Sequence, residues 1–462
     1  MYVEQLYTNC LAEAAYYIES DGHAVVIDPI REIDSYLEKA ASRNAKIDYV
    51  LETHFHADFI SGHIDLAKAT GAEIVFGPGA ETSYPIRNAR DGEMLHIGKV
   101  RIEVLHTPDH TLESTCYLLY DERGKAHALF TGDTLFVGDV GRSDLLDGTM
   151  TKEALAGMMY NSLTTKIKPL PDDILIYPAH GPGSACGKNI GKETWSTLGT
   201  QKQTNYALRD MTRDAFIAAV TSGLAAPPKY YFSDAVINKR GYAPLSDVLT
   251  RTLRALSIDE FEHEIAQGAL VLDVRTPNDF ERGHITGSIN IGLDGTYAWW
   301  AGTLLDIDIP LAIVAPQGGE EEAVRRLARV GYEMVRGYLK GGFEAWSERH
   351  LPASTIVSVE PTKFRELTND GIAILDVRNI GEFENGHIAG AVNIPLGVLE
   401  SRISELQPDR DYLVHCAAGY RSMIASSIMK RHGFERIVNV RGGYGAIKQM
   451  VPDMIETAPV EA

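Results

Sequence analysis

The sequence has few cysteines, fewer basic than acidic residues and no long apolar run. Its four cysteines among 462 residues (Cys10, Cys116, Cys186 and Cys416) are too sparse for a disulfide framework, which favours the reducing cytoplasm. Lys and Arg number 44 against 63 Asp and Glu, a formal charge of −19, and no basic stripe occurs, so nucleic acid is not expected as a partner. No segment approaches the roughly 20 apolar residues of a membrane helix, and the N-terminus does not resemble a signal peptide. The expectation is a soluble cytoplasmic protein with small-molecule partners.

Two segments of the C-terminal half match each other. They are "LVLDVRTPNDFERGHITGSINI" from Leu270 and "AILDVRNIGEFENGHIAGAVNI" from Ala373. A period of about 100 residues is too long for a solenoid and indicates a duplicated domain. In each copy an apolar strand ends in Asp-Val-Arg, and alternating strands and helices predict a parallel α/β sheet. Ser257 and Glu260 have capping-box spacing, which predicts a helix start. We expect three domains, over residues 1–250, 255–352 and 356–458.

The N-terminal part carries a different pattern, in which residues able to bind metal follow apolar β-branched runs. "THFHADFISGH" places His54, His56 and Asp58 at alternate positions after a strand. Later strands end in "TPDHT", "TGDT" and "YPAHG", which contribute His110, Asp133 and His180. Four such loops in this order predict a metal site.

Residues 1 to about 240 resemble the metallo-β-lactamase fold, an αββα sandwich, in the branch of glyoxalase II and the persulfide dioxygenases. In hydrolases of that fold, the first His-x-His pair and the "TPxHT" histidine hold one metal. The aspartate, the histidine after it and the "PAH" histidine hold a second, and the "TGD" aspartate bridges the two. This sequence has Phe59 where the second metal needs a histidine, and His63 is expected to face elsewhere. The pattern therefore favours one metal.

The persulfide dioxygenases of this branch use two histidines and one carboxylate for a mononuclear Fe(II). Carried over residue by residue, the resemblance implies His54, His110 and Asp133 as ligands, with Zn as an alternative occupant. It leaves His56, Asp58 and His180 to orient ligands and bound water.

Two further residues are candidates for substrate contact. Arg142 in "GRSDL" either grips a carboxylate or phosphate of a thiol carrier or forms a structural salt bridge. Cys186 in "PAHGPGSACGK" is expected near the pocket mouth, where it relays or guards sulfur or only packs. Cys10 and Cys116, in or beside apolar strands, are expected in the core.

The second repeat contains "LVHCAAGYRS", a cysteine after an apolar strand, then a small-residue loop and a helix. Backbone N–H groups of the loop, including that of Gly419, and the helix N-terminus would stabilise a thiolate or persulfide at Cys416, and Arg421 closes the loop. Four residues between Cys416 and Arg421 resemble the rhodanese family, whereas dual-specificity phosphatases have five. In the first repeat Ala315 and Glu320 take these places, so that copy is expected to be silent.

The whole arrangement is similar to bacterial persulfide dioxygenase–rhodanese fusions. That resemblance implies oxidation of a low-molecular-weight thiol persulfide by O2 to sulfite and thiol, with Cys416 exchanging sulfur among thiols, sulfite and thiosulfate. Three alternatives stay open: a zinc thioester hydrolase like glyoxalase II, a sulfurtransferase on a non-catalytic metal domain, and a sulfur carrier for a partner protein. The sequence leaves open the thiol, the direction of transfer and the oligomeric state, for which a homo-oligomer is one option.

Overall fold

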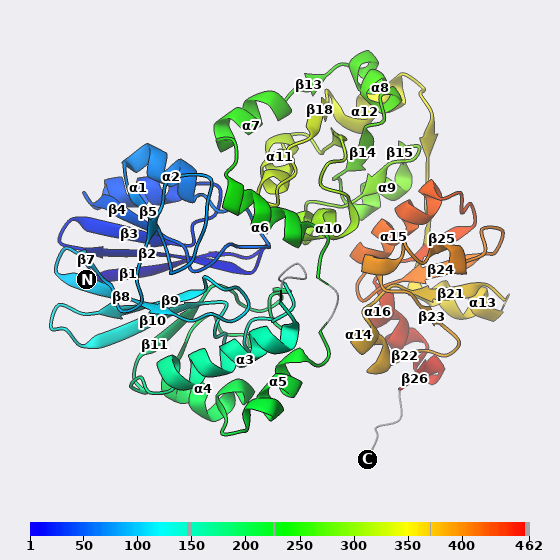
Figure 1. Cartoon of the computed structure of the whole chain (residues 1–462). Helices are drawn as coiled ribbons and strands as arrows, with labels where there is room; N and C mark the ends of the chain where they lie inside the picture. Colours follow the sequence, from blue (N-terminus) through cyan, green and yellow to red (C-terminus); the bar gives the residue numbers. More distant parts are fainter. Residues whose placement is uncertain (146–149, 225–226, 370, 458–462) are drawn as a thin grey trace. The chain divides into compact units, whose positions relative to one another are not determined.

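The computed structural model describes residues 1–145, 150–224, 227–369 and 371–457. The chain divides into two compact units, one formed by Met1–Val248 with Ala328–Tyr332 and the other by Leu249–Leu327 with Glu333–Ala462. Figure 1 shows the elements of both units. The finer domain boundaries expected from the sequence stay predictions. Among the described residues, no helix has the length and apolar character needed to cross a membrane.

Short apolar runs of the first unit form two six-stranded sheets. The first has the order β1-β2-β3-β4-β5-β6, made of β1 (Tyr2–Thr8), β2 (Glu13–Ser20), β3 (His23–Ile27), β4 (Lys46–Leu51), β5 (Glu73–Phe76) and β6 (Arg87–Asn88). The second has the order β12-β11-β10-β9-β8-β7, made of β7 (Met94–Ile97), β8 (Val100–His106), β9 (Thr115–Tyr120), β10 (Ala126–Gly132), β11 (Leu175–Pro178) and β12 (Ser196–Thr197).

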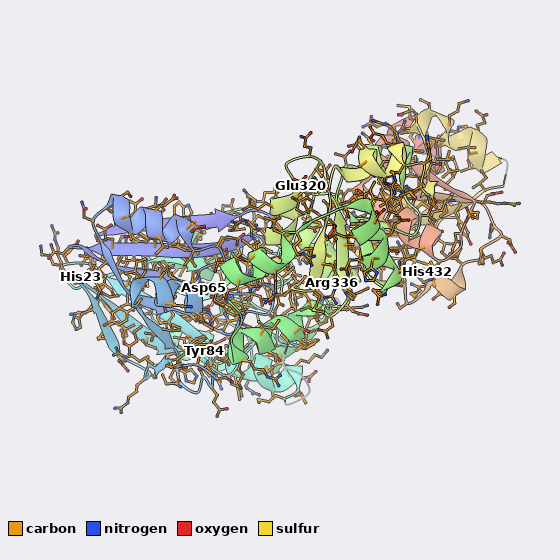
Figure 2. The ribbon with its side chains drawn as sticks, turned by 90° about the horizontal axis from the view of Figure 1, so that it is seen from above. His23, Asp65, Tyr84, Glu320, Arg336 and His432 are labelled. Carbon is orange, nitrogen blue, oxygen red and sulfur yellow. The ribbon has the colours of Figure 1, made fainter. Side chains whose placement is uncertain are left out.

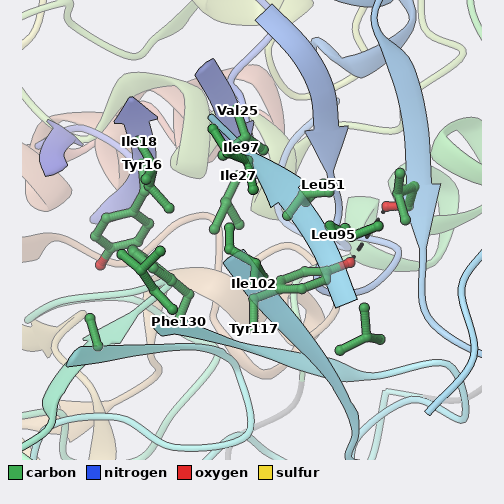
Figure 3. Packing of buried hydrophobic residues seen from close by; sticks show 14 of the residues in the cluster. Tyr16, Ile18, Val25, Ile27, Leu51, Leu95, Ile97, Ile102, Tyr117 and Phe130 are labelled. Carbon is green, nitrogen blue, oxygen red and sulfur yellow. Dashed lines mark hydrogen bonds between the residues drawn. The ribbon is translucent and has the colours of Figure 1, made fainter. Parts of the chain in front are cut away.

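The two sheets enclose an apolar core, drawn in Figure 3. Tyr16, Ile18 and Val25 of the first sheet belong to the same buried cluster as Ile102 and Phe130 of the second. The rings of Tyr16 and Phe130 meet edge to face with 4.9 Å between their centroids. Such an aromatic pair contributes about 0.5–1.5 kcal/mol beyond the burial of its surface. The packed interior therefore fixes the strand ends from which the candidate site loops emerge.

Helices cover the outer faces of both sheets, as Figure 1 shows. On the first sheet, α1 (Asp34–Ser42) and α2 (His63–Thr70) pack through Tyr36 and Leu66. On the second, apolar residues of α3 (Lys152–Ser162), α4 (Leu198–Thr204) and α5 (Arg213–Thr221) pack against β9, β10 and β11. Two more helices follow, α6 (Tyr230–Arg240) and α7 (Leu245–Thr252). The αββα sandwich expected from the sequence is confirmed.

The second unit contains two five-stranded parallel sheets of the same topology. The first repeat has the order β13-β18-β17-β14-β16, made of β13 (Ala255–Leu256), β14 (Leu270–Asp273), β16 (Ile289–Asn290), β17 (Leu311–Val314) and β18 (Val335–Leu339). The second has the order β20-β25-β24-β21-β23, made of β20 (Val357–Val359), β21 (Ala373–Asp376), β23 (Val392–Asn393), β24 (Tyr412–His415) and β25 (Ile437–Val440). Antiparallel pairs accompany them: β15 (His284–Ile285) with β19 (Ala353–Ser354), and β22 (His387–Ile388) with β26 (Ile455–Glu456). The equivalent strand orders confirm the duplicated parallel α/β domain.

Local sequence signals also explain details of the second unit. Helix α8 (Ile258–Ala266) starts with the capping box expected between Ser257 and Glu260. The other helices are α9 (Pro277–Arg282), α10 (Tyr297–Leu304), α11 (Glu320–Ala328), α12 (Gly342–Glu348), α13 (Phe364–Asn369), α14 (Ile380–Glu384), α15 (Tyr420–Arg431) and α16 (Gly443–Met450). The Asp-Val-Arg motifs form internal ion pairs, Asp273–Arg275 at 2.5 Å and Asp376–Arg378 at 2.6 Å.

Candidate metal centre and sulfur-transfer loop

Three predicted metal ligands meet at the ends of strands in the first unit. His54 follows β4, His110 follows β8, and Asp133 comes directly after β10. One ligand atom of each lies within 4.8 Å of the other two, and all three side chains are buried. Within the part of the chain that the structure describes, Nε2 of His110 is buried without a hydrogen-bond partner. A buried imidazole nitrogen without a protein partner is available to coordinate a metal ion, so the donor set fits one.

The neighbours of the two histidines fix which ring nitrogen faces this position. Thr53 Oγ1 donates to Asp28 Oδ2 at 2.8 Å, so it accepts from Nδ1 of His54, 2.9 Å away. Nδ1 of His110 donates to Asp109 Oδ1 at 2.5 Å. Both rings therefore carry their proton on Nδ1 and leave the Nε2 lone pair for a metal, the usual arrangement of ligating histidines.

Burial and neighbouring charge keep His54 and Asp133 in their metal-binding forms. Burial lowers the pKa of His54 well below its ordinary value, and the neighbouring His56 and His110 lower it further. Burial alone would raise the pKa of Asp133, but His180 and His54 outweigh burial and hold it far below its usual range. A neutral imidazole and an ionised carboxylate are the forms that bind metal.

His180 connects Asp133 to a second group of possible ligands. Its Nδ1 lies 2.8 Å from Asp133 Oδ1, and its Nε2 lies 2.7 Å from Asp58 Oδ2. Cys186 joins them, because one atom each of Asp58, His180 and Cys186 lies within 4.8 Å of the others. Cys186 is 2% exposed, so its side chain is buried, and its place near a pocket mouth stays a prediction. Burial also raises the pKa of its thiol, which disfavours the reactive thiolate.

His56 belongs to a third group of possible ligands, with Asp28 and Glu52, and its ring lies 4.2 Å from that of His54 between centroids. Its Nε2 lies 3.1 Å from Asp28 Oδ1 and 3.6 Å from Glu52 Oε2. The fully buried ring of Phe59 lies against its imidazole with 4.3 Å between centroids. Asp28 and Glu52 were not identified from the sequence, although both end apolar strands as Asp133 does. Both carboxylates lie beside His56, and Asp28 also orients His54 through Thr53.

Four other residues discussed in the sequence analysis were not predicted to be metal ligands. His63 starts α2 and lies 2.7 Å from the hydroxyl of Tyr84, which Figure 2 labels, so it faces away from the site as expected. Arg142 donates to both carboxylate oxygens of Asp144, at 2.7 and 2.9 Å, which is the salt-bridge alternative of its two predicted roles. Cys116 is buried as expected, whereas Cys10 is only partly buried.

In the second unit, Cys416 follows β24 and opens the loop that leads into α15. The N–H of Gly419 donates to its Sγ at 3.1 Å, and Gly419 has a φ of +110°, a conformation that favours glycine. The N–H of Tyr444 donates to the Cys416 carbonyl at 2.6 Å. A side chain on Gly443 would collide with that same carbonyl. The backbone is therefore shaped to stabilise negative charge on the Cys416 sulfur.

Arg421 begins the helix beside this loop and is held by a residue that the sequence analysis missed. It donates to both carboxylate oxygens of Glu382 in α14. Glu382 also closes a capping box with Asn379, and "NIGE" carries the spacing that could have revealed it. The guanidinium is thus fixed from a separate helix.

The strand register shows which positions of the two repeats are equivalent. Asp273 pairs with Val314 in the first repeat as Asp376 pairs with His415 in the second, so Ala315 takes the place of Cys416. Glu320, labelled in Figure 2, starts α11 at the place of Arg421 and is followed by two more glutamates. The first repeat offers neither thiol nor cation at this position.

Comparison with known proteins gives two families. Residues 8–180 match the metallo-beta-lactamase superfamily, and residues 257–349 and 360–450 each match the rhodanese-like domain. The 2.1 Å crystal structure of a metallo-beta-lactamase from Staphylococcus aureus subsp. aureus COL is 32% identical, with a TM-score of 0.66 over 74% of this chain and 99% of that one. ETHE1 from Myxococcus xanthus is 29% identical over 52% of this chain and 98% of its own, with a TM-score of 0.45.

Among curated proteins, a probable hydroxyacylglutathione hydrolase of Schizosaccharomyces pombe is 35% identical over 165 residues, 35% of this chain and 60% of its own length. The chain spans less than two thirds of the length of the curated hydroxyacylglutathione hydrolases that it matches first.

Proposed function

This chain belongs to the metallo-β-lactamase superfamily, and from its metal domain and two rhodanese-like domains we propose that it is a persulfide dioxygenase joined to a sulfurtransferase. The metal domain would take a low-molecular-weight thiol persulfide, O2 and water, and release the thiol, sulfite and two protons. Written out, RSSH + O2 + H2O gives RSH + SO3²⁻ + 2H⁺. Its second site would move sulfur through Cys416.

One observation carries the dioxygenase proposal: His54, His110 and Asp133 form a compact two-histidine, one-carboxylate group, while Phe59 occupies the neighbouring position. This donor set is the facial triad of non-haem iron oxygenases. An Fe(II) ion held there would supply O2 activation and the redox chemistry. The protein would contribute the ligands, fix their orientation through Thr53 and Asp109, and exclude water with buried rings.

The sulfurtransferase step follows from the Cys416 loop. A Cys416 thiolate would attack the outer sulfur of thiosulfate, forming a cysteine persulfide and releasing sulfite: Cys–S⁻ + S2O3²⁻ gives Cys–S–S⁻ + SO3²⁻. The N–H of Gly419, 3.1 Å from Sγ, supports the anion before and after transfer. Arg421 would attract the dianionic donor. Placing this site and the metal centre on one chain raises the effective concentration of shared sulfur species.

A thioester hydrolase of the glyoxalase II type is the second candidate. Asp58, His180 and Cys186 form a group beside the first, and Cys186 could replace the ligand that Phe59 removes. The curated relatives named hydroxyacylglutathione hydrolases also favour this reading. A hydrolase would need two metal ions and no O2, so the two candidates differ in measurable ways.

The test is oxygen uptake by Fe(II)-loaded protein given glutathione persulfide or coenzyme A persulfide, with sulfite and thiosulfate quantified. A Cys416→Ser variant is run beside the wild type. Uptake that persists in the variant while sulfite accumulates supports the dioxygenase with transfer downstream. No uptake with either persulfide, together with hydrolysis of S-lactoylglutathione by zinc-loaded protein, would overturn the proposal in favour of the hydrolase.

A further inference from the structure

The first repeat has neither a thiol nor a cation at the positions that match Cys416 and Arg421, yet it contacts the segment that follows Cys416. The hydroxyl of Tyr420, the first residue of α15, donates to the Gly292 carbonyl of the first repeat at 2.7 Å. Burial raises the pKa of this phenol, and Asp294 raises it further, so the group stays protonated and remains a donor. Tyr420 lies between Gly419, which donates to the Cys416 sulfur, and Arg421. A shift of the Tyr420 backbone would therefore move the residues on both sides of it, Gly419 and Arg421.

The segment that receives Tyr420 is itself fixed from inside the first repeat. Arg326 on α11 is buried, and its guanidinium donates to the carbonyls of Leu293 at 2.7 Å and Gly295 at 3.0 Å. The close packing favours glycine at position 295, because a β-carbon there would collide with the Tyr420 ring. Its φ lies outside the left-handed region, so an alanine would be opposed only by this collision. Arg326 thus fixes the backbone segment against which the Tyr420 ring packs.

Helix α15, which continues from the same loop, is held by the first repeat along its length. Met423 packs in a buried cluster with Phe280 of the first repeat. The N–H of Asn290, at the end of β16, donates to Ser427 Oγ at 3.1 Å. The first repeat therefore contacts the start of the helix and its next two turns.

We propose that the silent first repeat is retained as the anchor of the Cys416 loop, with Tyr420 as a positioning residue seated on the Gly292–Gly295 segment. This inference rests on the proposed sulfurtransferase function of Cys416 and deepens it. Tyr420 acts through the backbone of Gly419 and the placement of Arg421, and touches no substrate in this role. The first repeat would then affect catalysis at Cys416 without carrying out a reaction itself.

The test uses the full-length protein with Tyr420→Phe, which removes only the hydroxyl, and Gly295→Ala, which pushes on the ring from the first repeat. Tyr412→Phe is the matched control, because it removes a hydroxyl that accepts from the Gln407 N–H at the far end of β24. Gly397→Ala is the second control, since its added carbon would meet Thr303 at an ordinary contact distance of 3.5 Å. Circular dichroism and melting temperature show that each variant folds.

Two readouts are compared: kcat and KM for thiosulfate-to-glutathione transfer, and the pH midpoint of Cys416 alkylation, followed by mass spectrometry of its peptide. We expect kcat/KM to fall about tenfold in both test variants, because misplacement of catalytic groups by a fraction of an ångström is costly. The alkylation midpoint should rise by about half a pH unit as the thiolate loses its aligned N–H. Both controls should match the wild type.

Equal kcat/KM values and equal alkylation midpoints in the test and control variants would contradict the proposal that the first repeat anchors the Cys416 loop. If Gly295→Ala fails to fold, Tyr420→Phe decides alone. If the wild type shows no Cys416-dependent transfer, the proposed function fails, and the alkylation midpoints still decide whether Tyr420 positions the loop. The two failures are therefore distinguishable.

Discussion

Arg421 donates one hydrogen bond to each carboxylate oxygen of Glu382, at 2.6 and 2.7 Å. Glu382 also accepts from the Asn379 N–H at the start of α14, so its carboxylate is tied to that helix. A bidentate pair holds a guanidinium in one plane, which a lysine in its place could not match. The cation that faces the Cys416 loop is consequently set by a helix outside the loop.

From this pair we expect Arg421→Ala to lower kcat/KM for thiosulfate about a hundredfold, since a partly buried, aligned cation contributes about 3 kcal/mol to binding a charged transition state. Glu382→Ala should lower it about tenfold, because Arg421 keeps its charge and loses its orientation. Steady-state kinetics of both variants with thiosulfate and glutathione check this order. A Glu382→Ala enzyme as fast as the wild type would show that the orientation of Arg421 does not matter.

The fold was largely predictable, because local sequence patterns indicate both kinds of sheet. Apolar β-branched runs ending in His54, His110 or Asp133 predict strands whose ends converge, and the repeated Asp-Val-Arg predicts two parallel sheets. The structure brings the three candidate ligands together as expected, while their role as ligands stays a prediction. The burial of Cys186 was harder to predict, because it depends on how its loop packs against α6. The hydroxyl of Tyr231 in α6, which lies beside the Cys186 sulfur, is 45 positions away in the sequence.

Residues acting through distant partners were also missed. Glu382 was visible as a capping residue but not as the partner of Arg421, 39 positions away. The hydrogen bond from Tyr420 to the Gly292 carbonyl joins residues 128 positions apart, one in each repeat. Periodicity describes which face of an element is buried and says nothing about which element it meets.

The two activities should separate by mutation. His110→Ala removes one of three candidate ligands, so metal content and persulfide-dependent oxygen uptake should both fall at least about a hundredfold. Transfer from thiosulfate to glutathione should persist, because Cys416 belongs to a different domain. Cys416→Ser should give the reverse pattern. Metal analysis, an oxygen electrode and a transfer assay on the same preparations check both variants; loss of transfer in His110→Ala would contradict two independent sites.

The buried His284 should make the second unit sensitive to acid. Its Nδ1 lies 2.9 Å from the Phe280 carbonyl, its ring stacks on Phe280 at 3.8 Å between centroids, and burial lowers its pKa to about 4. The unfolded chain takes up a proton near pH 6.5, whereas the folded chain resists until about pH 4. Stability from the neutral ring is complete above about pH 6.5 and is lost as the pH falls toward 4, up to about 3 kcal/mol.

Melting temperatures between pH 7.5 and 4.5 check the sign. The wild type should lose more stability on acidification than His284→Gln, which has no titrating ring at this position. His432→Gln, at an exposed histidine labelled in Figure 2, should follow the wild type. Parallel pH curves for all three proteins would contradict the contribution of His284.

The silent repeat should not regain transfer from a thiol alone. In a Cys416→Ser background, Ala315→Cys places a sulfur at the matching strand end, but Glu320, Glu321 and Glu322 open the following helix. Their charges oppose a thiolate and repel thiosulfate, so transfer should stay at background. Adding Glu320→Arg should raise the alkylation rate of the introduced thiol at pH 7 by about tenfold. An Ala315→Cys protein that transfers sulfur without the second change would show that the acidic helix start does not silence this copy.

Phe59 offers the sharpest distinction between a one-metal and a two-metal centre. The ring is fully buried against His56, and an imidazole in its place would add the ligand expected by two-metal hydrolases of this fold. Phe59→His with zinc supplied should raise metal content from about one to about two ions per chain, with Asp58 and His180 as the neighbouring donors. The variant should gain hydrolysis of S-lactoylglutathione and lose oxygen uptake, because a second ion occupies positions that the iron chemistry needs open.

Phe59→Leu controls for loss of the ring, since it removes the stacking on His56 without adding a donor. Both variants should be about 1–3 kcal/mol less stable than the wild type, through a cavity in one case and a buried polar group in the other. Two metal ions per wild-type chain would mean that Cys186 already supplies the missing ligand, and the hydrolase would then become the better account of this centre. One ion in the wild type and two in Phe59→His would locate the choice between the two reactions in a single buried side chain.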